Sequence, residues 1–153
     1  MSKNNPGASI VAALIPYGSV GVEIGVWLGA SSLEFAQRTS HLHLVDPWYE
    51  RDDQYQSVKQ LFRGRPVTIH RVPAGWFFTD FTDKVDWVYI DGAHDYDSVK
   101  ADLIGAASIL KPGGVIYGDD YGKKGGVKEA VDEYVHVRSR ELRLLGLSQY
   151  AIS

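Results

Sequence analysis

The residues of this chain that could do chemistry are carboxylates that follow short apolar runs. Glu23, Asp46 and Asp91 each stand at or near the end of such a run, and the pair Asp119 and Asp120 ends another. Runs of this length suit strands buried on both faces, and the helix-like segments between them are typical of a parallel α/β sheet. Ligands of such sheets bind at the carboxyl ends of the strands. We therefore expect these acids to converge on one crevice that suits a cationic ligand, a hydroxyl-rich ligand or a metal ion.

The elements that must position these acids can be traced along the sequence. Strands are predicted at residues 20–24, 42–46, 67–72, 86–91 and 115–119. Apolar spacing predicts helices at 8–17, 30–38, 54–62, 96–110 and 126–137, and a weak helix or an aromatic connection at 74–81. Two last runs, 142–147 and 149–152, are too close for a crossover helix and should form an antiparallel hairpin. The predicted fold is an α/β, Rossmann-like three-layer sandwich with a mostly parallel seven-stranded sheet.

Length, charge and composition narrow the class of protein. The 153 residues favour one domain spanning 1–153. The net charge of −3 gives no electrostatic footprint for nucleic acid, and no basic run indicates a membrane surface. The absence of cysteine excludes disulfides and thiolate metal sites. Residues 1–7 lack the regions of a signal peptide, and no run approaches the ~18 apolar residues of a membrane span. We expect a soluble cytoplasmic protein that binds neither nucleic acid nor membranes.

The turn after the first strand separates two ligand classes. A dinucleotide turn needs G-x-G-x-x-G, because its second glycine lets the backbone approach a pyrophosphate. Aligned on Gly25, this chain has Trp27 at the second position and Ala30 at the third. Its spacing is instead Glu23-x-Gly25-x-x-x-Gly29. A carboxylate at the turn repels phosphate and suits an ammonium or sulfonium group, so the pattern disfavours NAD and FAD.

Four motifs together resemble the class I methyltransferases that use S-adenosylmethionine (SAM). They are Val22-Glu23-Ile24-Gly25, Asp46-Pro47-Trp48, Asp91-Gly92-x-His94-x-Tyr96, and Leu110-Lys111-Pro112-Gly113-Gly114 before a strand. The resemblance covers nearly the whole chain and is greatest to the small group whose fourth strand ends in Asp-Gly-x-His. It implies a SAM-dependent methyltransferase that acts on oxygen of a small hydroxylated acceptor.

The resemblance also implies a set of cofactor contacts. Gly25 and Gly29 would let the backbone pass close to the methionine part of SAM, and Glu23 would lie near its amino group. Asp46 would accept hydrogen bonds from both ribose hydroxyls. The full expected set is Glu23, Gly25, Val26, Trp27, Gly29, Ser31, Asp46, Pro47, Trp48, Ala74, Gly75 and Asp91. The alternatives are that the acids are solvated strand ends and that Trp48 belongs to the core.

A second group of acids, Asp91, Asp119 and Asp120, exceeds what SAM requires. Neighbouring strands should bring these carboxylates together, where they repel unless a cation neutralises them. Oxygen ligands favour a hard divalent ion, with Mg²⁺ first. The group resembles the metal site of catechol, caffeoyl-CoA and macrolide-sugar O-methyltransferases. That resemblance implies a metal at these three acids and catalytic roles for Asp91 and His94, with His94 as general base in place of the usual lysine.

Several alternatives stay open at this stage. His94 could cap the following helix, and Asp119 and Asp120 could be loop acids paired with Lys123 and Lys124. The chain could bind SAM without transferring a methyl group, as a sensor or an accessory subunit. It could also be a hydroxylase-like enzyme on the same fold. A site without an obvious lid and an exposed terminal hairpin are compatible with a homodimer.

Overall fold

The computed structural model describes residues 6–153. Most of residues 1–7, where the sequence predicts no signal peptide, lies outside this range. The helices are α1 (Pro6–Ala12), α2 (Ala30–Ala36), α3 (Asp52–Leu61), α4 (Ala74–Asp80), α5 (Tyr96–Ile109) and α6 (Val127–Arg138). The strands are β1 (Ser19–Ile24), β2 (Thr39–Val45), β3 (Val67–His70), β4 (Val85–Ile90), β5 (Leu110–Gly118), β6 (Leu142–Gly146) and β7 (Gln149–Ile152). No helix within this range is both long and apolar enough to cross a bilayer.

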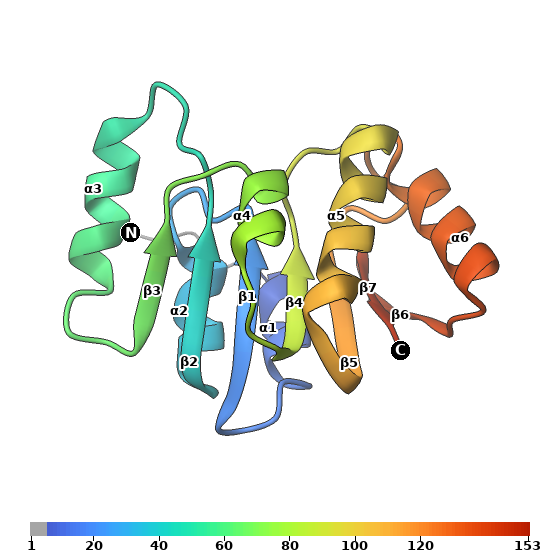
Figure 1. Cartoon of the computed structure of the whole chain (residues 1–153), viewed down its shortest axis with the longest axis horizontal. Coiled ribbons are helices and arrows are strands. Elements are labelled where there is room, and N and C mark those ends of the chain that lie inside the picture. The colour runs from blue at the N-terminus through green and yellow to red at the C-terminus, as the bar shows by residue number, and fades with distance from the viewer. Residues whose placement is uncertain (1–5) are drawn as a thin grey trace.

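The strands form one seven-stranded sheet in the order β3-β2-β1-β4-β5-β7-β6 (Figure 1). The first five strands are parallel, whereas β7 pairs antiparallel with both β5 and β6. The predicted fold class is therefore confirmed, including the terminal hairpin. Because β1 and β4 are neighbours at the centre of this order, the chain reverses its direction of winding between them. Crevices at such a switch point are where open α/β sheets bind ligands.

Helices cover both faces of the sheet (Figure 1). Alternate residues of β1 and β4, such as Val22 and Val88, pack in one core with α4, α5 and α6. Their neighbours Trp87 and Tyr89 pack in the second core with Phe35 of α2. Strands that are apolar on both faces thus produce two cores separated by the sheet.

The turn before β5 differs from its predicted position. The expected strand began at Val115, but pairing with β4 already starts at Leu110 and shifts between the pairs Val85↔Leu110 and Trp87↔Val115. The intervening Lys-Pro-Gly-Gly segment is therefore an irregularity within β5, and Gly113 has a φ of 79° there. Proline lacks a backbone donor and glycine tolerates positive φ, which explains why this composition interrupts regular pairing.

Two histidines meet on the face of the sheet that α4 covers. His43 of β2 and His70 of β3 lie with Nδ1 and Nε2 only 3.0 Å apart, and the ring of Phe81 packs 5.0 Å from His43. Burial, together with His41 and His70, lowers the pKa of His43 to about 4. A histidine held neutral in the fold but not in the unfolded chain links stability to pH.

This linkage predicts a pH-dependent stability that replacement of His43 reduces. The unfolded chain binds the proton with a pKa near 6.5, so His43 stabilises the fold above that pH and loses the contribution as pH falls toward 4. Chemical denaturation at several pH values should show a shallower loss of unfolding free energy over this range in His43→Gln than in the wild type. His136→Gln, at an exposed position of α6, is the control and should keep the wild-type slope. Equal slopes in all three proteins would contradict this assignment.

Candidate active site

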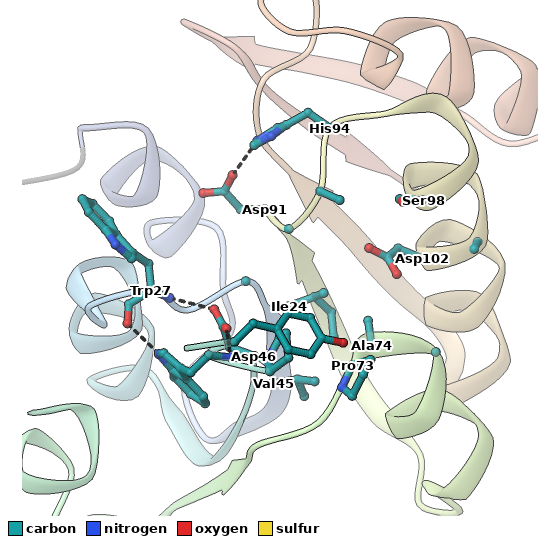
Figure 2. Close-up of a pocket in the computed structure, with 18 of the residues that line it drawn as sticks. Ile24, Trp27, Val45, Asp46, Pro73, Ala74, Asp91, His94, Ser98 and Asp102 are labelled. Atoms are coloured by element: carbon teal, nitrogen blue, oxygen red, sulfur yellow. Dashed lines mark hydrogen bonds and ion pairs between the residues drawn. The ribbon is translucent and has the colours of Figure 1, made fainter. Parts of the chain in front are cut away.

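A cavity of about 920 Å³ lies at the carboxyl ends of the central strands, where the sequence predicted that the acids converge. Its walls come from the turns after β1, β2 and β4, from the first turns of α3 and α4, and from the first two turns of α5 (Figure 2). The lining includes three carboxylates, those of Asp46, Asp91 and Asp102, among mostly apolar surroundings. A cavity of this size and character is large enough for a nucleoside-sized ligand.

Gly25 sets the floor of the cavity. Its φ is 86°, and a Cβ atom built at this residue would lie 2.1 Å from the carbonyl oxygen of Asp91 on the neighbouring strand end. The amide of Asp91 in turn donates to the carbonyl of Ile24 at 2.8 Å. Only glycine allows this combination of positive φ and close backbone approach.

Asp46 is fixed by the backbone of two turns. Its Oδ2 accepts hydrogen bonds from the amides of Val26 and Trp27, both at 3.0 Å, and its Oδ1 accepts from the amide of Trp48 at 2.8 Å (Figure 2). The carboxylate therefore connects the end of β2 to the glycine turn. Each carboxylate oxygen can accept more than one bond, so this anchoring leaves acceptor capacity toward the cavity.

Asp91 and His94 line another part of the cavity, and Asp120 lies beside His94. The Nε2 of His94 lies 3.8 Å from Asp91 Oδ1 and 2.8 Å from Asp120 Oδ2. One ligand-type atom from each of the three lies within 4.8 Å of the others. Burial, followed by the charges of Asp119 and Asp120, raises the pKa of Asp91 to about 7. A cluster with a raised carboxyl pKa in a cleft is a typical functional site.

Asp119 lies differently from the predicted metal set. Its Oδ1 accepts hydrogen bonds from Ser148 Oγ of the hairpin turn at 2.5 Å and from Gln149 Nε2, at the start of β7, at 2.6 Å. The structure groups His94 with Asp91 and Asp120 in its place. The alternative of a lysine partner also has support, because Lys124 Nζ lies 3.2 Å from Asp120 Oδ2.

Residues 22–121 match the model of a family described as methyltransferase domain. The chain belongs to this family. The match spans four of the five parallel strands whole and half of β1, and it includes all three cavity carboxylates. The protein is thus a class I SAM-dependent methyltransferase, as the four sequence motifs predicted. No curated protein matches the methyltransferase by sequence.

Solved structures share the fold at low sequence identity. A proposed caffeoyl-CoA O-methyltransferase from Staphylococcus aureus is 18% identical with a TM-score of 0.75, covering 99% of this chain and 84% of that one. SMU.1697c from Streptococcus mutans, in complex with SAH, is 11% identical with a TM-score of 0.71, covering 96% and 94%. Trm5b from Pyrococcus abyssi is 18% identical with a TM-score of 0.65. The match covers 99% of this chain but only 48% of Trm5b. Proteins described as rRNA methylases also match.

The predicted cofactor residues divide into two groups. The cavity is lined by Gly25, Trp27, Asp46, Pro47, Trp48, Ala74, Gly75 and Asp91, whereas Glu23, Val26, Gly29 and Ser31 do not line it. Trp48 touches the cavity yet is only 1% exposed, and its Nε1 donates to the carbonyl of Trp27 at 2.9 Å. Most of its ring therefore belongs to the core of the methyltransferase.

Successive residues of a strand point to opposite faces of the sheet. Val22 and Ile24 pack in the core with α4, α5 and α6, so Glu23 between them faces α2 on the other side. Its fully buried carboxyl accepts hydrogen bonds from Ser31 at 2.6 Å and from Ser32. Burial raises its pKa to about 8, although the two hydroxyls act in the opposite direction. In this structure Glu23 holds α2 against β1, and its contact with the cofactor remains a prediction.

The cluster of Asp91, His94 and Asp120 fits a divalent cation. The Nε2 of His94 is buried without a correctly aligned hydrogen-bond partner within residues 6–153, even though Asp120 lies 2.8 Å away. Two carboxylates and an imidazole nitrogen that face one another are an ordinary ligand set for Mn²⁺ or Fe²⁺, and they tolerate Mg²⁺ through the oxygens. The nitrogen shifts the expectation away from the all-oxygen set that the sequence predicted.

Sequence reasoning missed two polar groups in the cavity. Asp102 looks like an ordinary surface acid of α5, yet it is only 8% exposed and lines the cavity. Gln54 of α3 presents a buried Oε1 that finds no partner within the described part of the chain. The apolar spacing of α5, in which Asp102 precedes the buried Leu103, was the available signal that its side chain lies near the sheet.

Two glycines with positive φ provide a matched pair of tests. Gly25→Ala combines positive φ, which costs about 1–2 kcal/mol for an ordinary residue, with a clash against the Asp91 carbonyl. We expect this variant to lose thermal stability and SAH affinity together. Gly64→Ala also has positive φ but meets no atom within 4 Å, and Gly64 does not line the cavity, so this variant should retain SAH affinity. Melting curves and calorimetric titration with SAH measure the two effects. An unchanged Gly25→Ala protein would contradict the close approach at the cavity floor.

Proposed function

We propose that this methyltransferase transfers the methyl group of SAM to a hydroxyl oxygen of a small acceptor. The observation that carries the proposal is the cluster of Asp91, His94 and Asp120, whose first two members line the cavity that Asp46 also lines. One wall thus offers an acceptor for ribose hydroxyls, and the other offers groups that can bind and deprotonate an acceptor hydroxyl.

The positions of these groups support one orientation of SAM in the cavity. Asp46, held by three backbone amides, would accept hydrogen bonds from the ribose hydroxyls. The glycine turn at Gly25 leaves room for the methionine part close to the backbone. The reacting end of SAM would then face Asp91 and His94, so that the methyl group and the acceptor meet there.

The transfer itself is a single displacement. The acceptor oxygen forms a bond to the methyl carbon while the bond from that carbon to the sulfonium sulfur breaks, which releases S-adenosylhomocysteine (SAH). The hydroxyl proton passes to His94, whose ring lies between Asp91 and Asp120. The acids stabilise the imidazolium that forms. Orientation of the two substrates supplies a large part of the rate enhancement in such a reaction.

A divalent cation would be held by Asp91 and Asp120, which leaves the Nε2 of His94 to accept the proton. When bound, it would supply a positive charge that acidifies the acceptor hydroxyl. The Lys124 ammonium, 3.2 Å from Asp120, already supplies part of such a charge. Whether the enzyme requires a metal is a separate question, and it is tested apart from methyl transfer itself. A cytoplasmic location and a homodimer remain predictions.

Methyl transfer to a panel of catechols, vicinal diols and sugars tests this function. With labelled SAM and Mg²⁺ or Mn²⁺, we expect product on at least one hydroxylated acceptor and a loss of activity in chelator. Replacement of His94 by glutamine removes the proposed base and should lower kcat at least about 100-fold. Asp120→Asn should abolish the metal-stimulated part of the activity.

The controls separate the parts of the proposal. Asp97→Asn changes an exposed acid in the first turn of α5 and should retain wild-type activity. Full activity of the wild type in chelator would exclude the metal. SAM binding without turnover on the whole panel would favour a sensor or accessory subunit, and methylation of RNA alone would overturn the small acceptor. Failure to bind SAM or SAH would favour another enzyme on this fold.

A further inference from the structure

Asp102 is the one cavity carboxylate without a partner among residues 6–153. Asp46 accepts three backbone hydrogen bonds and Asp91 lies beside His94, but no hydrogen bond or ion pair reaches Asp102. It is nevertheless 92% buried, being 8% exposed. Figure 2 shows its carboxyl group projecting from α5 into the cavity, with Ser98 one turn earlier on the same helix.

The surroundings of Asp102 make this isolation costly. The cavity wall on this side is apolar and is formed by Ile24, Val45, Pro73, Ala74 and Ala101. Burial, followed by the charge of Asp95, raises the pKa of Asp102 to about 7. Buried polar groups without partners are rare in proteins, and they are expected where a ligand provides the missing hydrogen bond.

The remaining groups of SAM indicate which donor would satisfy it. In the proposed orientation of SAM, Asp46 would face the ribose and Asp91 with His94 would face the reacting end, so the adenine base is the part left for the wall that carries Asp102. Adenine is flat and apolar on both faces, which suits Pro73, Ala74 and Ala101, and its edge carries an exocyclic amine that donates hydrogen bonds.

We propose that Asp102 accepts a hydrogen bond from the exocyclic amine of the SAM adenine and thereby selects adenine over bases that carry a carbonyl oxygen at that position. The inference rests on the proposed function, because it requires SAM to bind in this cavity. It adds a specificity-determining residue that comes from α5, an element that the glycine turn and the strand-end motifs do not include.

Calorimetric binding of two product analogues tests this role. SAH carries the amine, whereas S-inosylhomocysteine carries a carbonyl oxygen in its place and cannot donate there. A hydrogen bond to a charged group contributes about 1.5–3 kcal/mol, which corresponds to about 10- to 150-fold in affinity. We therefore expect the wild type to bind SAH at least about tenfold more tightly than the inosine analogue.

Two substitutions separate recognition from folding. Asp102→Asn offers both a donor and an acceptor, so the preference should fall to within a few-fold. Asp102→Ala should bind SAH at least about tenfold more weakly and lose the preference, while its melting temperature at pH 8 stays equal or rises because a buried unpaired carboxylate is removed. Asp97→Asn on the same helix is the matched control and should retain the wild-type preference.

A third ligand distinguishes the adenine amine from the ammonium of the methionine part. 5′-Methylthioadenosine has the base but no ammonium, so Asp102→Ala should weaken its binding as much as that of SAH. If only SAH binding is weakened, Asp102 pairs with the ammonium and the proposal is wrong. It is also wrong if Asp102→Ala keeps the preference and lowers the melting temperature, because the residue then has a structural role only.

The result for the wild type separates this inference from the function on which it rests. If the wild type binds SAH and Asp102→Ala binds both analogues with unchanged affinity, the adenine contact is refuted and the proposed function stands. If the wild type binds neither analogue, both are refuted.

Discussion

The close approach of the backbone at Gly25 to the end of β4 is the constraint on which the site depends. β1 and β4 are paired neighbours, and the chain leaves the sheet at Gly25 with its Cα against the carbonyl of Asp91. A side chain there would separate the two strand ends. Because the turn stays close to the end of β4, the amides of Val26 and Trp27 can donate hydrogen bonds to Asp46. The turn then forms the floor of the cavity and does not fill it.

This arrangement crowds carboxylates into a small volume, and the fold stabilises each in a different way. Asp46 is held by backbone amides, Glu23 by two serine hydroxyls behind the sheet, and Asp119 by the hairpin turn. Asp120 has a histidine and a lysine beside it. Asp91 lies beside His94, and of the acids that line the cavity only Asp102 has no such group within residues 6–153. The pattern separates acids that maintain the structure from acids left available to a ligand, and their positions in the sequence do not reveal this distinction.

The sequence predicted the sheet and the edge at which ligands would bind, because both follow from local patterns. Apolar runs that end in acids define buried parallel strands, and their carboxyl ends must share one edge. The direction of each side chain depends on tertiary packing instead. Glu23 turns to α2 because strand residues alternate between faces, and Asp119 bonds the β6–β7 turn, which is distant in sequence. The burial of Asp102 depends on how α5 packs against β4, which periodicity alone does not give.

We propose that the acids at the strand ends form two cooperating parts of one methyl-transfer site. A crystal structure with SAH and Mn²⁺ tests it most directly. We predict SAH in the cavity with its ribose on Asp46 and its sulfur facing Asp91 and His94, and anomalous density for the ion between Asp91 and Asp120. SAH bound elsewhere, or bound with its sulfur directed away from Asp91 and His94, would contradict the account.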